Sequence, residues 1–305
     1  MPRYTYGGQA LIEGVLMRGR DAIAVALRHP DGRIVFATER LDSGFHGTRW
    51  SKLPLLRGLV VLYETLIVGT RWLVRSAGLQ AEEEGVELGK GSIILMLVIT
   101  LIAGVGIFFL LPLFIASVTT AQVENQFVQH LVEGLVKVAI FLGYLWIIGQ
   151  SGDIHRVFQY HGAEHKTINA LEAGAELTPT NVQKFSLIHA RCGTAFLLWV
   201  MVIAIFVFAF VGRPEWYWLI ASRIVLLPVI AGLAYEVIRY AGMHQSNRVL
   251  MKLLAPGLWL QRLTTREPTD DQVEVSILAL RRVVEREEAE TTEQHRLESR
   301  VEVMA

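Results

Sequence analysis

The stretch His161-Gly162-Ala163-Glu164-His165 carries residue types that can bind and use a metal ion. On a helix, His161 and His165 are i and i+4 neighbours, so both imidazoles project from one face toward a single point. Glu164 lies beside them, where its carboxylate can take a proton from a water molecule activated by a metal ion. This is the His-x-x-Glu-His order of inverted zinc hydrolases, so we predict two metal ligands and a general base.

Two histidines do not complete such a site, because a catalytic zinc ion usually has three protein ligands and one open position. His189 and Cys192 are the best candidates for the remaining ligands, since they stand three residues apart where a later apolar segment begins. The structural alternative is that the two helical histidines face water and that Cys192 is a small buried residue.

Three carboxylates are further candidate ligands. Glu172 follows His165 by seven residues and therefore falls near the same helical stripe. Glu236 stands at one end of an apolar segment, where an unpaired charge is expensive. Asp153 precedes the histidines on the same side of the membrane. The simpler alternatives are ion pairs with arginines three residues further on, Asp153 with Arg156 and Glu236 with Arg239.

The chain is rich in apolar residues, at 52% of the sequence, and they are concentrated in long runs. No Lys, Arg, Asp or Glu occurs between Lys90 and Glu124, or between Arg191 and Arg213. A helix needs about 20 apolar residues to cross a bilayer, and both runs are long enough. We predict a mainly α-helical membrane protein with a four-span bundle. The predicted spans are at about 92–118, 131–150, 194–212 and 216–240.

The distribution of basic residues predicts the orientation of this bundle. Lys and Arg are frequent in the 151–193 loop and after the fourth span, whereas the loops at the opposite side carry almost none. The positive-inside rule therefore places both termini and the 151–193 loop in the cytoplasm. All the candidate ligands then lie at the cytoplasmic face. At the other end, Glu133 and Arg223 reach similar depths and are expected to pair.

The segments outside the spans predict smaller units. The turn His29-Pro30-Asp31-Gly32 joins two apolar runs into a β-hairpin, and the glycine-rich residues 7–19 favour a tight backbone turn against a sheet. Residues 54–77 predict an amphipathic helix that lies on the membrane or on the bundle, with entry into the membrane left open. Val273, Ile277, Leu280 and Val284 predict a second amphipathic helix docked on the cytoplasmic side, followed by a frayed charged end.

These features divide the chain into six segments. They are an N-terminal β-hairpin unit (1–50), an amphipathic helix with an acidic linker (51–90), the first two spans (91–150), a cytoplasmic loop with the candidate ligands (151–193), the last two spans (194–240) and a cytoplasmic tail (241–305).

Charge and cysteine content exclude two classes of protein. Lys and Arg together number 29, as do Asp and Glu, so the net charge gives no bulk electrostatic reason to bind nucleic acid. Cys192 is the only cysteine, which excludes an intrachain disulfide framework and suits a reducing compartment.

Four motifs, in order, resemble the YqhQ-like family of bacterial multi-span membrane proteins. They are Tyr6-Gly7-Gly8-Gln9-Ala10-Leu11-Ile12-Glu13-Gly14-Val15-Leu16-Met17-Arg18-Gly19, Tyr160-His161-Gly162-Ala163-Glu164-His165-Lys166, His189-Ala190-Arg191-Cys192-Gly193-Thr194 and the segment from Pro256 to Pro268. The resemblance covers roughly residues 4–280, and departs mildly where Ala190 replaces a frequent Pro. It implies a bacterial cytoplasmic (inner) membrane protein with a domain of unknown function, described as a predicted metal-dependent enzyme. It supplies no reaction.

Three functional hypotheses follow. The first is a metal-dependent enzyme, a zinc hydrolase acting at the cytoplasmic membrane face on a peptide or lipid substrate. The second is a metal or proton transporter, or a metal sensor, that uses the same ligands without hydrolysis. The third is a non-catalytic membrane scaffold. A transport role predicts polar residues through the whole membrane, whereas here they stop at one face apart from Glu133, Lys137 and Arg223. This pattern slightly favours an enzyme or a sensor over a transporter. The sequence does not indicate the oligomeric state.

Overall fold

A computed structural model describes residues 6–41, 44–83, 89–212, 215–244 and 247–304. Its strands are β1 (Gly7–Leu11), β2 (Gly14–Arg18), β3 (Ala22–Arg28) and β4 (Ile34–Arg40). The helices before the candidate site are α1 (Leu56–Glu83), α2 (Lys90–Val105), the π-helical turn η1 (Gly106–Leu110), α3 (Leu111–Thr119) and α4 (Gln126–Ile148). They are followed by α5 (Gly152–Glu172), α6 (Pro179–Val182), α7 (Gly193–Val211), α8 (Trp216–Met243), α9 (Arg248–Thr264) and α10 (Asp270–Met304).

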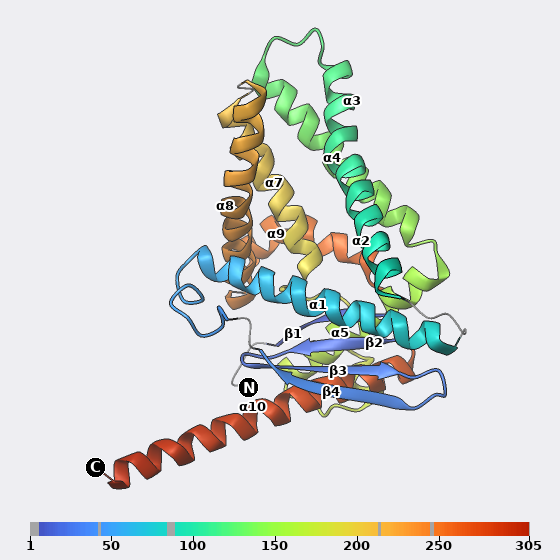
Figure 1. Cartoon of the computed structure of the whole chain (residues 1–305), viewed down its shortest axis with the longest axis vertical. Helices are drawn as coiled ribbons and strands as arrows, with labels where there is room; N and C mark the ends of the chain where they lie inside the picture. Colours follow the sequence, from blue (N-terminus) through green and yellow to red (C-terminus); the bar gives the residue numbers. More distant parts are fainter. Residues whose placement is uncertain (1–5, 42–43, 84–88, 213–214, 245–246, 305) are drawn as a thin grey trace.

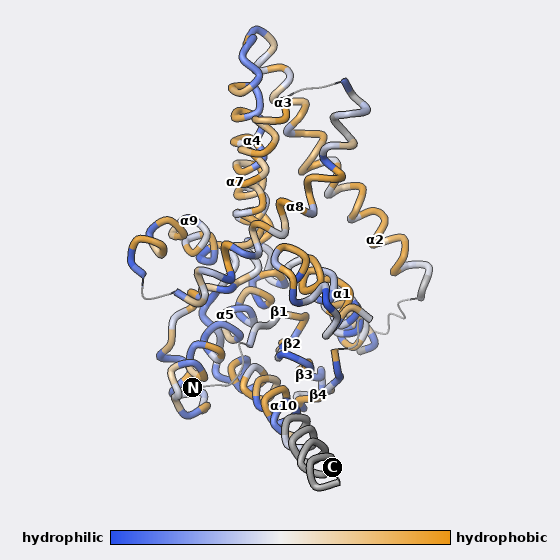
Figure 2. The backbone as a smooth tube through the Cα atoms, turned by 90° about the vertical axis from the view of Figure 1, so that its left-hand side faces the viewer, coloured by the Kyte–Doolittle hydropathy of each residue, from blue (hydrophilic) through white to orange (hydrophobic). Residues whose placement is uncertain are grey.

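Among the described residues, four helices are long and apolar enough to span a membrane, as predicted. They cover Gly91–Thr119, Gln126–Ile148, Gly193–Val211 and Ala221–Met243. Figure 1 shows them rising together above the rest of the chain, and Figure 2 shows that they are predominantly hydrophobic. The first is continuous through η1, which stands directly before Pro112. Because proline has no N–H to donate and its ring clashes with the preceding turn, a local widening of the helix to a π-helical turn accommodates it.

The N-terminal unit is a four-stranded antiparallel meander in the order β1-β2-β3-β4. The hairpin predicted around Pro30 is present as β3 and β4. Residues 7–19, predicted as a tight backbone turn against a sheet, contain such a turn at Ile12 and Glu13, but the flanking residues are strands of the sheet and form a second hairpin, β1–β2. Glu13 closes its turn with φ of 54°, a left-handed conformation that residue patterns alone rarely indicate.

Helices cover both faces of this sheet (Figure 1). Successive residues of β2 and β3 point to opposite faces, and both faces are buried because helices pack on each side. Leu16, Ile23 and Val25 pack against Trp72 of α1. On the other face, Met17 and the alanines of β3 pack against α5 and α10. The amphipathic tail helix therefore docks on the sheet, and the helix continues to Met304.

Helix α1 connects the sheet to the bundle. Arg57, at its first turn, binds Glu236 of α8, and Glu64 is buried beside Arg18 of β2. The polar side of the predicted amphipathic helix therefore forms ion pairs with neighbouring elements. Leu66 and Ile67 remain more than half exposed, as expected for a helix lying on a membrane surface. The acidic linker that follows falls mostly on residues 84–88, outside the described residues.

Candidate metal centre

Helix α5 presents the central motif because its other face is fixed to the sheet. Tyr160 and Ile168 are fully buried in the core formed with β2, β3 and α10. Glu13, in the β1–β2 turn, accepts hydrogen bonds from Arg156 at 2.5 and 2.6 Å and from the Tyr160 hydroxyl at 3.3 Å. These contacts set the rotation of α5 about its axis.

Three of the four predicted ligands lie within reach of one ion. One side-chain donor atom from each of His161, His165 and Cys192 can be chosen so that all three atoms lie within 4.8 Å of one another. The Cys192 Sγ atom is 3.3 Å from Nε2 of His161, and the His161 and His165 ring centroids are 4.4 Å apart. Two imidazole nitrogens and one sulfur are a donor set that suits zinc and leaves a fourth position open.

Backbone carbonyl groups orient both histidine rings. Nδ1 of His161 donates to the Thr264 carbonyl oxygen at 2.8 Å, and Nδ1 of His165 donates to the Leu187 carbonyl oxygen at 2.5 Å. A carbonyl can only accept, so Nδ1 of each ring carries a hydrogen, and a ring in its neutral form has its lone pair on Nε2. This is the outer arrangement that typically supports metal-binding histidines.

The buried Nε2 atom of His165 is a second feature that suits a bound cation. Nε2 of His165 is buried and has no hydrogen-bond partner of normal geometry within the described residues. A buried polar nitrogen without a partner is costly, and structures that retain one usually need an explanation. A bond from this nitrogen to a metal ion would satisfy it.

The electrostatics of the cluster favour the thiolate form of Cys192. Burial raises the pKa of this thiol, but the imidazoles of His161 and His165 outweigh burial and hold the pKa well below its usual value. Burial lowers the pKa of His161, and the neighbouring Cys192 and Glu164 reverse this, raising it to about 9. Cys192 also caps the N-terminus of α7, accepting from the Thr194 N–H at 3.4 Å, where a thiolate is further stabilised.

Glu164 is buried beside the cluster, with its carboxylate held by strand β1. Burial raises the pKa of this carboxyl, while His165 and His161 act in the opposite direction. The Gly8 N–H donates to it, and a β-carbon on Gly8 would lie 2.9 Å from the Glu164 Cγ and Cδ atoms. Only a glycine in this strand lets the carboxyl group approach the backbone so closely.

His189 lies next to the cluster but outside the group of three. Its ring centroid is 5.6 Å from that of His165, and its Nε2 is 4.0 Å from Glu172. The Gln261 side chain clamps its backbone, accepting from the His189 N–H at 2.9 Å and donating to its carbonyl at 2.8 Å. Burial lowers the pKa of His189 well below the usual value, so the ring is neutral.

The three candidate carboxylates are placed elsewhere. Asp153 is exposed in the first turn of α5 and does not pair with Arg156, which binds Glu13. Glu172 binds Arg191 and so supports the turn that carries Cys192.

Glu236 binds Arg57 and accepts from the Leu55 N–H at 3.1 Å. The expected ion pairs of Asp153 with Arg156 and of Glu236 with Arg239 are therefore replaced by pairs between distant segments.

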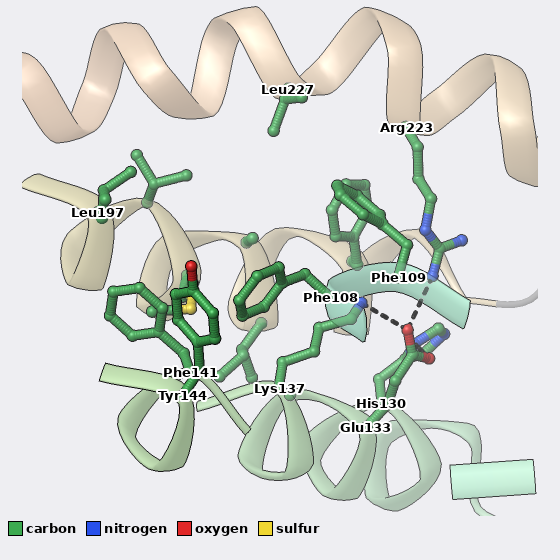
Figure 3. A pocket seen from close by; sticks show the side chains of 16 residues that line it. Phe108, Phe109, His130, Glu133, Lys137, Phe141, Tyr144, Leu197, Arg223 and Leu227 are labelled. Carbon is green, nitrogen blue, oxygen red and sulfur yellow. Dashed lines mark hydrogen bonds and ion pairs between the residues drawn. The ribbon is translucent and has the colours of Figure 1, made fainter. Parts of the chain in front are cut away.

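A polar group inside the bundle lies apart from this centre (Figure 3). Glu133 accepts from Lys137 at 2.7 Å and from Arg223 at 3.2 Å, which confirms the predicted pairing of Glu133 with Arg223. These residues line a largely apolar cavity of about 420 Å³ between the spans, with Phe108 and Phe141 along its wall.

The supporting residues Gly8, Leu187, Gln261 and Thr264 were not predicted from spacing. Two of them act through backbone carbonyl groups, which any residue type supplies, and Gly8 acts by lacking a side chain. The only signal was indirect: Gly8 and the segment containing Gln261 and Thr264 lie within the motifs that carry the family resemblance.

The fold and this cluster define a class of helical protein in which four candidate membrane spans meet a small antiparallel sheet at a His–His–Cys group. Residues 53–286 match the family described as "Protein of unknown function (DUF1385)", and the chain belongs to this family. It is 36% identical over 285 residues to "Uncharacterized protein YqhQ" of Bacillus subtilis (strain 168), covering 89% of this chain and 90% of that protein. The predicted resemblance is thereby confirmed. No solved structure matches the chain.

Proposed function

We propose that this protein is a metal-dependent membrane enzyme, a zinc hydrolase whose centre is formed by His161, His165 and Cys192. The observation that carries the proposal is the convergence of their donor atoms within 4.8 Å. The fixed orientation of both rings supports it, because each Nδ1 is bonded to a backbone carbonyl and each Nε2 is the ring atom that remains to bind a metal. The contact of His161 Nε2 is with Cys192, another member of the group.

A zinc ion supplies a Lewis acid and lowers the pKa of water to about 7. Glu164 is placed to accept the proton from the attacking water, and its burial beside the cluster excludes competing solvent. In the hydrolysis, hydroxide adds to the electrophilic atom of the substrate, and the proton held by Glu164 passes to the leaving group. Cys192, His161 and His165 do not exchange protons with the substrate in this scheme.

The proposed location is the bacterial inner membrane, with both termini and the metal centre on the cytoplasmic side. Support comes from the four apolar helices and from the concentration of Lys and Arg in the segments beside the centre. The proposed partner of the four helices is the lipid bilayer. Glu133 is bound by Lys137 and Arg223 inside the bundle, as expected for charges that have a structural role. This group therefore lends no support to a transport role.

Metal analysis of the purified full chain tests this proposal. We expect about one zinc per chain in detergent micelles, and less than about a tenth of that in the His161→Ala and Cys192→Ala variants. Glu164→Gln should retain the metal and fail to restore function to cells that lack the protein. A wild-type protein without bound metal, or a His161→Ala variant with unchanged metal content, would overturn the proposal.

His189→Ala is the matched control, because this histidine is buried and adjacent to the centre but lies outside the group of three. We expect it to retain zinc. Loss of zinc in His189→Ala together with retention in Cys192→Ala would assign the third ligand to His189 instead.

A further inference from the structure

A second cavity, of about 390 Å³, lies where the sheet, α1 and the inner ends of α7 and α8 meet. Its walls are largely apolar and include Leu16, Ile23, Val61, Phe196 and Ile238. It therefore lies at the junction between the candidate membrane spans and the polar part of the chain. A molecule with both an apolar and a polar part would match this position.

The polar lining of this cavity is positively charged. It contains three arginines, Arg18, Arg191 and Arg239, and one carboxylate, Glu64. Arg18 is bound to Glu64, and Arg191 is bound to Glu172.

Arg239 differs from the other two. It is half-buried and has no hydrogen bond or ion pair within the described parts of the chain, because the nearby Glu236 is bound by Arg57. Gly242, one turn further along α8, packs against the Arg191 side chain, so both arginines are on the same side of the cavity. Guanidinium groups bind phosphate through two parallel hydrogen bonds, which makes them suited to an acidic headgroup.

The cavity shares a wall with the candidate metal centre. Gly8, whose N–H binds Glu164, lines it, and so do Arg191 and Gly193 on either side of Cys192. The bundle cavity in Figure 3 lacks this relation to the centre, and its two cations are bound to Glu133. The cavity beneath α7 and α8 is thus the better candidate for a substrate site.

We propose that this cavity binds an anionic phospholipid, with the acidic headgroup at Arg239 and part of an acyl chain along Val61 and Phe196. Charge complementarity and the position at the membrane junction carry the proposal. That this lipid is also the substrate of the metal centre rests on the proposed function. That the cavity binds the lipid does not depend on it.

Lipid binding to the purified full chain in detergent micelles tests this proposal. The probes are phosphatidylglycerol and phosphatidylcholine with identical acyl chains, and inorganic phosphate alone. We expect one phosphatidylglycerol per chain by native mass spectrometry, bound at least about tenfold more tightly than phosphatidylcholine. Equal binding of the two lipids overturns the proposal. Binding of phosphate as tight as that of phosphatidylglycerol also overturns it, since the site would then recognise a free anion.

Two variants and a control locate the site. Arg239→Gln should weaken phosphatidylglycerol binding by about tenfold, the loss expected for a charged hydrogen-bond donor. Val61→Trp should weaken both lipids by filling the apolar wall, and it keeps the proposal testable where Arg239→Gln does not fold. Arg248→Ala removes an exposed arginine at the start of α9 and should leave binding within about twofold. Unchanged binding in the folded Arg239→Gln variant, or in Val61→Trp, overturns the proposal.

Zinc content, measured on the same samples, separates the two proposals. Selective lipid binding without zinc would overturn the proposed function and leave the lipid site standing. Zinc without selective lipid binding would overturn the lipid site alone.

Discussion

Gly8 and Glu164, which are far apart in the sequence, are in direct contact, and the strand that contains the glycine holds the proposed general base. A β-carbon at position 8 would lie 2.9 Å from the Glu164 carboxyl carbon and 2.6 Å from the Leu16 carbonyl oxygen. The N-terminal sheet is therefore a wall of the centre as well as a support for α5.

Gly8→Ala should destabilise the protein and displace Glu164, because the strand cannot yield without breaking its pairing with β2. We expect the free energy of unfolding in micelles to fall by about 1–3 kcal/mol, the usual cost of overpacking. The matched control is Gly7→Ala, since nothing lies within 4 Å of a β-carbon at position 7. Chemical denaturation of the two variants measures the difference, and equal stability would contradict the close contact at Gly8.

Gly162→Ala should loosen the metal centre without touching a ligand. A β-carbon at position 162 would clash with the backbone carbonyl of Arg266, two residues beyond the Thr264 carbonyl that orients His161. Loss of such outer support typically lowers metal affinity by about 10–100-fold. Competition with a chelator measures the affinity. Gly152→Ala, on the same helix with open space around it, should bind zinc within about threefold of the wild type.

The sequence predicts the ligands of this centre better than their supports, for a physical reason. His161 and His165 are brought together by helical spacing, and Cys192 joins them because spans end and begin at the same face. The supports come from long-range packing. Glu236 is bound by Arg57, which is 179 residues away. No local sequence pattern could predict Arg57 as the partner in preference to the neighbouring Arg239. Likewise, the β1–β2 hairpin depends on the left-handed conformation of Glu13. Its glycine-rich sequence is typical of a loop, so residue types alone do not indicate two strands.

Removal of the metal should expose Cys192 to alkylation. As the only cysteine in the chain, it reports without ambiguity, and it is held as a thiolate beside two imidazoles. We expect a chelator to raise the rate of iodoacetamide modification by about tenfold or more, and added zinc to restore protection, because a thiolate bound to metal is a poor nucleophile. Mass spectrometry of the intact chain measures the rate. The same rate with and without chelator would show that Cys192 is not a ligand.

Glu236→Gln should weaken the attachment of α1 to α8 and leave zinc content unchanged. The carboxylate binds the Arg57 guanidinium and the Leu55 N–H, and charged hydrogen bonds of this kind contribute about 1.5–3 kcal/mol each when partly shielded. Both side chains are about a quarter exposed, so we expect a total loss near 2 kcal/mol. A double-mutant cycle with Arg57→Ala isolates the pair. Loss of zinc in Glu236→Gln would return this residue to the set of ligands.

Gly134→Ala tests the packing of the bundle independently of the metal centre. Gly134 of α4 lies directly against Ile205 of α7, so a β-carbon at this position must push the two helices apart. We expect a loss of about 1–3 kcal/mol in unfolding free energy, again from overpacking. Gly143→Ala is the control on the same helix: nothing lies within 4 Å of its β-carbon, and alanine favours the helix, so stability should be unchanged or slightly higher. Equal effects of the two substitutions on stability would contradict the close crossing of α4 and α7. A loss of stability in Gly134→Ala alone, with zinc retained, would show that the bundle and the metal centre are separately stabilised.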